Sequence, residues 1–274
     1  MQNPSVKSRT VHTVRGTERQ THDDCIAVEE PLEIRVAREG EPGQGRAVSI
    51  TMRTPGYDAQ LAAGFLYGEG VIRHRDDVVT IKRYGDRGSV IRVEVPAATT
   101  LDLARLERNF YTSSSCGVCG KTSIEAVTAT LPAHAIESDF EVDAALLPTL
   151  ADRARQAQQV FEQTGGLHAA SLFDDSGALL ATFEDVGRHN AMDKLVGALY
   201  LREVLPAPRS ILLLSGRASF ELLQKAMAAG IPVVVAMGAP SSLAIELADR
   251  AGIMLAGFLR AHSYNVYTHA ERLR

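Results

Sequence analysis

The sequence predicts an α/β protein, in which a smaller, strand-rich N-terminal lobe precedes a three-layer α/β/α domain with a mixed sheet. Strand-like and helix-like segments alternate three times toward the C-terminus, an order typical of sheets covered by helices. The last strands are apolar along their whole length, as expected when helices cover both faces of a sheet. The chain has 274 residues, of which 45% are hydrophobic, and this is enough for a sizeable core.

Most of the N-terminal part alternates apolar and polar residues with a period of two, which is typical of strands. We expect the polar residues 1–20 to form a disordered tail and residues 21–110 to form the strand-rich lobe. One segment changes to a helical period, with Leu61 and Phe65 four residues apart. The predicted elements are strands at Pro31–Arg38 and Ala47–Thr54, a helix at Asp58–Gly68, and a hairpin of Val78–Tyr84 with Ser89–Val95.

The three-layer domain is predicted to occupy residues 146–274. Its first helix, Pro148–Gln163, places Leu150 and Ala154 on one face and stops before Gly165. A hairpin with a polar turn follows, and then helices and strands alternate. The predicted elements are hairpin strands at Leu167–Phe173 and Ala178–Phe183, helices at Asn190–Leu205, Ser219–Ala229 and Ser242–Ala251, and strands at Ile211–Leu214, Pro232–Met237 and Ile253–Leu259.

This order of elements is similar to the cytidine-deaminase-like fold, in which deaminases carry zinc ligands at two helix starts, as His-x-Glu and Pro-Cys-x-x-Cys. The corresponding helix starts here contain neither motif. They read Glu184-Asp185-Val186-Gly187-Arg188-His189-Asn190 and Ser215-Gly216-Arg217-Ala218-Ser219, and the third helix start reads Ala239-Pro240-Ser241-Ser242.

Glycine beside arginine, with hydroxyl and amide groups, suits phosphate held on helix N-termini. We therefore expect three helix starts to converge on one sheet edge and to hold an anionic ligand. The structural alternative is that Gly187 and Gly216 are ordinary turn residues, that the serines are N-caps, and that Arg188 and Arg217 are surface charges.

Two of the three cysteines form a Cys-x-x-Cys motif, Cys116-Gly117-Val118-Cys119, within a predicted exposed loop and connection at residues 111–145. Lys121 and free backbone N–H groups nearby favour the thiolate, the reactive form of cysteine. The same motif also serves zinc sites, redox disulfides and sulfur carriers. Zinc would need more ligands, and the remaining candidates, Cys25, His134, His168 and His189, form no ready-made pair, so we expect no structural metal.

Composition narrows the function further. No apolar run approaches the ~20 residues needed to cross a bilayer, and the polar N-terminus lacks the apolar stretch of a signal peptide. A cytoplasmic protein without membrane insertion is therefore predicted, and a paired Cys motif suits a reducing compartment. A net charge of −4 without a dense basic run argues against nucleic acid as a partner. The P-loop pattern of nucleotide triphosphatases is not found in the sequence.

Taken together, the motifs resemble those of the formate dehydrogenase accessory sulfurtransferases, the FdhD family, from about Glu30 onward. The matching segments are Met52-Arg53-Thr54-Pro55-Gly56, Gly64-Phe65-Leu66 with Glu69-Gly70, Ser114-Ser115-Cys116-Gly117-Val118-Cys119-Gly120-Lys121, Gly165-Gly166-Leu167-His168-Ala169-Ala170, the three helix starts given above, and Asn265-Val266-Tyr267-Thr268. One departure is Ala261, at a position where the family pattern leads us to expect glycine.

The resemblance implies a sulfurtransferase that accepts sulfur as a persulfide from a cysteine desulfurase. It would pass that sulfur to the metal of a molybdenum bis(molybdopterin guanine dinucleotide) cofactor, bound as substrate, before formate dehydrogenase receives it. In this scheme Cys116 carries the persulfide and Cys119 acts with it in relay or release. The family also implies a homodimer that recognises the guanine nucleotide moiety of the cofactor.

The family match assigns cofactor binding to the segment after the last apolar strand, namely Phe258, Leu259, Arg260, Ala261, His262 and Ser263. Arg260 is expected to meet phosphate. His168, Arg188, His189 and Arg217 are secondary candidates. Two alternatives remain open: a thiol–disulfide oxidoreductase in which the cysteines cycle, and a non-catalytic escort for the cofactor.

Overall fold

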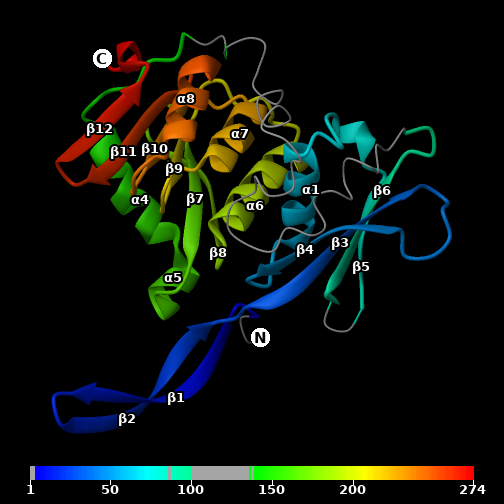
Figure 1. Ribbon diagram of the computed structural model, residues 1–274, viewed down its shortest axis with the longest axis horizontal. Coiled ribbons are helices and arrows are strands. Elements are labelled where there is room, and N and C mark those ends of the chain that lie inside the picture. The colour runs from blue at the N-terminus through cyan, green and yellow to red at the C-terminus, as the bar shows by residue number, and fades with distance from the viewer. Residues whose placement is uncertain (1–3, 86–87, 100–135, 137–138) are drawn as a thin grey trace.

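The computed structural model describes residues 4–85, 88–99, 136 and 139–274 (Figure 1). The N-terminal lobe is built on a sheet with the strand order β4-β3-β6-β5. Antiparallel pairs β3/β4 and β5/β6 are joined by a parallel contact between β3 and β6, and the expected hairpin is confirmed. The strands are β3 (Glu30–Arg38), β4 (Arg46–Arg53), β5 (Thr80–Tyr84) and β6 (Val90–Val95).

The predicted helix at Asp58–Gly68 is confirmed as α1, and it covers one face of this sheet. The strands present alternate residues to the helix, and Leu32, Ile34 and Val36 on β3 are almost fully buried. The lobe therefore has its own apolar cluster, which also receives Tyr200 from a much later part of the chain. A short 3-10 turn, η1 (Arg75–Asp77), connects α1 to β5.

The N-terminus forms a hairpin where we expected a disordered tail over residues 1–20. β1 (Val6–Arg15) and β2 (Glu18–Ala27) pair in antiparallel register and extend away from the body (Figure 1). The turn is made possible by Gly16, whose positive φ of 62° suits a left-handed turn position. Most of these residues are exposed, so their polar composition reflects a solvated ribbon.

The central sheet has the strand order β12-β11-β10-β9-β7-β8 and is mixed, as predicted. β9, β10 and β11 are parallel, whereas β7 is antiparallel to both of its neighbours and β12 is antiparallel to β11. β12 was not expected from the sequence. The strands are β7 (His168–Phe173), β8 (Leu179–Asp185), β9 (Ile211–Leu214), β10 (Val233–Ala236), β11 (Met254–Arg260) and β12 (Ser263–Thr268).

Helices cover both faces of the central sheet. Leu212, Val234 and Leu255 point to α6, α7 and α8, while the alternate residues of the same strands face the opposite layer. The helices on the first face are α6 (Arg188–Leu201), α7 (Phe220–Ala228) and α8 (Ser242–Ala251), and the opposite layer contains η3 (Leu147–Thr149) and α4 (Leu150–Ala157). The short η4 (Ala270–Arg272) lies near the C-terminus.

The helix expected at Pro148–Gln163 is interrupted. α4 ends at Ala157, and a second helix, α5 (Gln159–Thr164), begins after Gln158, whose backbone is non-helical with φ −84° and ψ 70°. The apolar period continues through the break, which is why the sequence pattern alone does not reveal it. The break places Gln158, which is buried, at the wall of a pocket.

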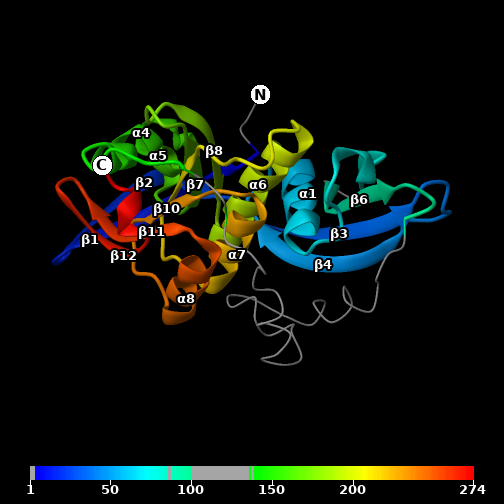
Figure 2. The ribbon, with the colours of Figure 1, turned by 90° about the horizontal axis from the view of Figure 1, so that it is seen from above.

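The two lobes are joined by α1 and α6, which lie side by side in Figures 1 and 2. Glycines allow their backbones to approach closely. A Cβ atom at Gly64 would lie 1.9 Å from the carbonyl oxygen of Asp193, and one at Gly197 would lie 1.8 Å from that of Gln60. The lobes therefore share one tightly packed helix pair.

Among the helices of the described ranges, none is long and apolar enough to cross a bilayer.

Candidate functional site

Three helix starts meet at one edge of the central sheet, as the sequence predicts. β9, β10 and β11 are parallel, so their C-terminal ends share this edge. Backbone hydrogen bonds connect the loops: Gly238 N–H donates to the Gly216 carbonyl at 2.9 Å, and Ser241 N–H donates to the Ala218 carbonyl at 3.0 Å. We call the residues 184–190, 215–219 and 238–242 the helix-start edge.

Asp185 fixes the start of α6. Its side chain is fully buried, and one carboxylate oxygen accepts hydrogen bonds from the backbone N–H of Gly187 at 2.9 Å and from the Asn190 amide at 3.1 Å. The other oxygen accepts one from the Thr54 N–H at 3.1 Å and pairs with Lys194 Nζ at 2.7 Å. This carboxylate therefore holds the α6 start against the N-terminal lobe.

His189 lies one residue into α6 and contacts the start of α7. Its Nε2 is 3.3 Å from the Ser219 hydroxyl and 3.4 Å from a Glu221 carboxylate oxygen. Burial lowers the pKa of His189 to about 4, although the negative charge of Glu221 opposes that change. The imidazole is therefore neutral at physiological pH.

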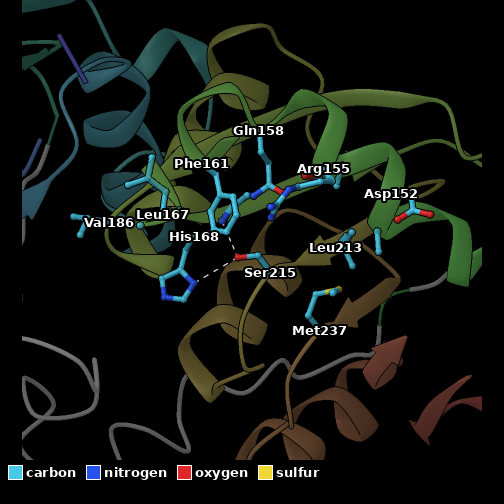
Figure 3. Close-up of a pocket in the computed structure, with 16 residues that line it drawn as sticks. Asp152, Arg155, Gln158, Phe161, Leu167, His168, Val186, Leu213, Ser215 and Met237 are labelled. Carbon is cyan, nitrogen blue, oxygen red and sulfur yellow. Dashed lines mark hydrogen bonds between the residues drawn. The ribbon is translucent and has the colours of Figure 1, made fainter. Parts of the chain in front are cut away.

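His168 begins β7 and faces the start of the loop after β9. Its Nδ1 is 3.5 Å from the Ser215 hydroxyl, which also accepts a hydrogen bond from the Ala169 N–H at 2.8 Å (Figure 3). Burial lowers the pKa of His168, and the Arg188 charge lowers it further, while Asp185 opposes both. Two neutral imidazoles thus lie at the helix-start edge, where they can donate or accept hydrogen bonds.

The predicted cofactor-binding segment, Phe258 to Ser263, borders this edge at the turn between β11 and β12. Phe258 is exposed and adopts a left-handed backbone with φ 55°, which is unusual for an aromatic residue. Its N–H donates to the Gly238 carbonyl, and the Arg260 guanidinium donates to the Met237 carbonyl at 2.7 Å. An aromatic face and a guanidinium therefore stand next to the α8 start.

The other members of that segment differ in their surroundings. Ala261, His262 and Ser263 are exposed at the turn. Leu259 is fully buried in the core cluster on the α4 side of the sheet. Its side chain is part of the core, so within the described structure only its backbone is available to a ligand.

Cys116 and Cys119 lie outside the described residues, as do most of the predicted loop and His134. Cys25 is a free, exposed cysteine on β2. Within the described ranges, no group of three or more His, Cys, Asp or Glu side chains is arranged to hold a metal ion.

A pocket of about 540 Å³ opens beside His168 and Ser215 (Figure 3). Leu213 and Met237 come from the ends of β9 and β10, and α4 and α5 form the opposite wall. The Arg155 guanidinium lies 4.0 Å from the centre of the Phe161 ring. The polar residues that α4 and the break after it contribute to the pocket are Asp152, Arg155 and Gln158.

These three side chains are not among the site residues expected from the sequence. They recur at a spacing of three, which places them along one side of a helix. Glu184 also has a role that the motif did not suggest, because its carboxylate accepts hydrogen bonds from the N–H groups of Phe161 at 2.7 Å and Val160 at 3.0 Å. The helix-start edge is therefore tied directly to the pocket wall.

The fold is a mixed α/β architecture. Polar helix starts, neutral histidines and a pocket large enough for a small molecule lie together at one edge of its central sheet. Residues 27–274 match the FdhD/NarQ family. The chain belongs to this family.

The relatives are similar over nearly their whole length. A protein of Mycobacterium tuberculosis named sulfur carrier protein FdhD is 49% identical, with 92% of this chain and 93% of the relative covered. Proteins of the same name from Streptomyces coelicolor and Sulfurisphaera tokodaii are 48% and 40% identical, and cover 97% and 98% of this chain and 94% and 99% of their own length.

A solved structure supports the fold. The crystal structure of a putative formate dehydrogenase accessory protein from Desulfotalea psychrophila superposes with a TM-score of 0.74, covering 99% of this chain and 100% of that one. The sequence identity is 24%, so this likeness concerns the architecture.

Proposed function

We propose that this protein is a sulfur carrier that receives sulfur as a Cys116 persulfide from a cysteine desulfurase and transfers it to the metal of a molybdenum bis(molybdopterin guanine dinucleotide). The sulfurated cofactor then passes to formate dehydrogenase. The observation that carries the proposal is the 49% identity, over 92% of this chain, to proteins named sulfur carrier protein FdhD. The Cys-x-x-Cys motif supplies the chemistry that a sulfur carrier needs.

In the first step the Cys116 thiolate attacks the outer sulfur of the desulfurase persulfide. A new S–S bond forms on Cys116, and the desulfurase thiolate leaves. In the second step the outer sulfur moves to the metal as sulfide, while the Cys119 thiol attacks Cys116 and closes a disulfide. The two electrons that reduce the sulfur therefore come from the Cys116 and Cys119 pair, which an external thiol must reduce before the next cycle.

The helix-start edge suits the cofactor as substrate. Arg188, Arg217 and Arg260 offer positive charge next to helix N-termini, where phosphate groups are favoured. The exposed Phe258 ring offers a face on which a base can stack. In this proposal the neutral His168 and His189 serve as hydrogen-bonding groups toward the substrate, and Ala261, His262 and Ser263 approach it from the β11–β12 turn.

The proposal includes a cytoplasmic homodimer with a cytidine-deaminase-like central domain. The mixed sheet with helices on both faces agrees with that fold assignment. The client and donor are the formate dehydrogenase and the cysteine desulfurase of the same cell, and neither nucleic acid nor membrane takes part.

The test is intact-protein and peptide mass analysis after incubation with a cysteine desulfurase and free cysteine. We expect one added sulfur on Cys116 in the wild-type protein and none in Cys116→Ala. Cys119→Ala is expected to keep the persulfide but to lose delivery of sulfur. A Cys25→Ala control should behave as wild type.

Two results would favour the alternatives. If a Cys116→Ala/Cys119→Ala double variant restored formate dehydrogenase activity in cells lacking the protein, the chain would be an escort. If neither cysteine took up sulfur but both cycled through a disulfide, it would be an oxidoreductase.

A further inference from the structure

His189, the second residue of α6, meets two oxygen atoms with the same ring nitrogen. Its Nε2 lies 3.3 Å from the Ser219 hydroxyl and 3.4 Å from a carboxylate oxygen of Glu221. The other oxygen of Glu221 lies 3.8 Å from Lys225 Nζ, so this carboxylate is part of an ion pair. A bare Nε2 would direct its lone pair at a negative oxygen, whereas a protonated Nε2 is attracted to both oxygens. The Glu221 carboxylate thus selects the tautomer of His189 that carries its proton on Nε2.

Ser219 contacts the imidazole in place of an ordinary structural role. It stands at the N-cap of α7, where a serine side chain usually accepts a hydrogen bond from a backbone N–H of the first turn. Within the described part of the chain its side chain makes no such bond, whereas Ser241 at the start of α8 accepts one from the Ala244 N–H. The Ser219 hydroxyl is therefore committed to Nε2 of His189.

The second ring nitrogen of His189 is left as a hydrogen-bond acceptor. In the tautomer with a proton on Nε2, Nδ1 carries a lone pair and no proton. Within the described ranges Nδ1 makes no hydrogen bond, and it is not one of the buried polar atoms that lack a partner there. Nδ1 is therefore accessible to a ligand at the helix-start edge.

The chemistry around Nδ1 selects the group that it meets. The helix N-termini and the nearby charge of Arg188 favour the phosphate groups of the cofactor, whose oxygens are themselves hydrogen-bond acceptors. Nδ1 must therefore meet a donor and not a phosphate oxygen. On the nucleotide side of the cofactor, the donors closest to the phosphates are the hydroxyl groups of the sugar, because the sugar is bonded directly to the phosphate.

We infer that His189 is a specificity-determining residue whose Nδ1 accepts a hydrogen bond from a sugar hydroxyl of the guanine nucleotide, and that Glu221 is the positioning residue that sets its tautomer. The inference rests on the proposed function, which supplies the nucleotide. It gives the His189 hydrogen bond a direction, from substrate to protein. It also gives a role to Glu221, which acts through His189 and does not touch the substrate.

Nitrogen-15 NMR of the full-length protein with labelled histidine tests the tautomer without any ligand, and His189→Phe assigns the signals by their loss. We expect a protonated Nε2 and a bare Nδ1 at neutral pH. Ser219→Ala should keep this tautomer, and so should Glu221→Gln, whose amide oxygen still accepts from Nε2–H. Glu221→Met should lose the preference. A proton on Nδ1 in the wild-type protein, or the wild-type tautomer in Glu221→Met, would overturn the inference.

Isothermal titration of the full-length protein with GDP, with 2′,3′-dideoxy-GDP and with pyrophosphate tests the hydroxyl contact. We expect the wild type to bind GDP about tenfold more tightly than the dideoxy analogue, because the analogue leaves Nδ1 without its donor. His189→Phe and Glu221→Met should reduce this ratio to about twofold or less and leave pyrophosphate binding unchanged. His12→Phe, on the exposed β1 strand, is the matched control and should keep the wild-type ratio.

The inference is overturned if the wild type does not bind GDP, if it binds the dideoxy analogue equally well, or if the ratio is unchanged in either variant that folds. A matching loss of pyrophosphate affinity would show a general structural effect and would also overturn it. Persulfide formation on Cys116 is read separately by mass analysis, so failure of the hydroxyl contact and failure of sulfur transfer are distinguishable.

Discussion

Helix α6 has two buried Lys–Asp pairs on neighbouring residues, and they serve different parts of the molecule. Lys194 pairs with Asp185 at 2.7 Å, and this carboxylate also holds Gly187, directly before the first helical residues Arg188 and His189. Asp193, one residue before Lys194, pairs with Lys225 of α7 at 2.6 Å, where α6 packs against α1 and α7. The start of α6 positions the candidate site, and its body joins the lobes.

The two pairs also differ in their electrostatics. Burial raises the pKa of Asp193 to about 7, although the Lys225 charge opposes that rise. Burial alone would lower the pKa of Lys225, but the negative charges of Asp193, Glu221 and Glu69 outweigh it and raise the pKa. Asp193 has one cation as its partner, whereas Asp185 also accepts three hydrogen bonds. A buried carboxylate that several hydrogen-bond donors surround, such as Asp185, therefore holds the neighbouring backbone in position.

The largest effect is expected at the α6 start. Asp185→Ala should lower the free energy of unfolding by about 4 kcal/mol, because it leaves Lys194 as a buried, uncompensated charge and releases three donors. Urea unfolding followed by circular dichroism measures this. Asp249→Ala removes a carboxylate that is 72% exposed and should change stability by less than about 0.5 kcal/mol. A loss below about 1 kcal/mol for Asp185→Ala would contradict its anchoring role.

Added side-chain volume in the middle of α6 should destabilise the protein nearly as much. Gly197→Ala places a Cβ atom 1.8 Å from the Gln60 carbonyl oxygen, so the helices must separate, and we expect a loss of about 3 kcal/mol. Thermal unfolding measures this effect. Gly166→Ala meets its nearest neighbour at 3.7 Å and serves as a control with little effect. Equal melting temperatures for the two variants would show that α1 and α6 are not closely packed in solution.

Removing the cation of the second pair should give a smaller loss that depends on pH. Lys225→Met is expected to cost about 2 kcal/mol at pH 8, where the Asp193 carboxylate is ionised and buried without its partner. The loss should shrink at pH 6, because a pKa already raised to about 7 rises further and the carboxyl takes up a proton. Urea unfolding at both pH values tests this, and an unchanged loss would contradict the raised pKa.

Protonation of His189 should affect the stability of the protein only at acidic pH. Its folded pKa of about 4 lies below the ordinary histidine pKa of 6.5, so the folded state binds fewer protons and stability falls as the pH drops below 6.5. His189→Gln should remove this dependence and be relatively more stable at pH 5 than at pH 8, by about 2 kcal/mol. His12→Gln, on the exposed β1 strand, is the control. Parallel pH profiles for wild type and His189→Gln would contradict the burial of the ring.

Much of the central sheet could be predicted because its strands are short apolar runs between amphipathic helices. The positions of β9, α6, α7 and α8 follow from that pattern within a few residues, with the largest difference, four residues, at the end of α6. The β1–β2 arm could not be predicted in the same way, since an exposed ribbon has no buried face and so lacks a strong alternation signal. The break at Gln158 was hidden because residues on either side keep the helical period.

The parts of the candidate site that are formed by contiguous sequence motifs could be predicted. The helix starts at Gly187 and Gly216 read as anion-binding turns, and the structure brings them to one edge. The pocket side chains of α4 carry no such motif, because a polar residue every third position is common on any exposed helix. The linkage from Glu184 to α5 depends on tertiary contact over 23 residues, and short-range patterns contain no information about it.

Tyr200 has a consequence for how this protein is made. It stands on α6, yet it belongs to the apolar cluster that α1 and the β3–β6 sheet form about a hundred residues earlier. A ribosome delivers the N-terminal lobe first, and folding domains usually mature in the order of synthesis. Here the first lobe emerges with its α1 surface uncovered and stays incomplete until translation has passed α6, so the nascent chain exposes that surface until Leu201 has been made.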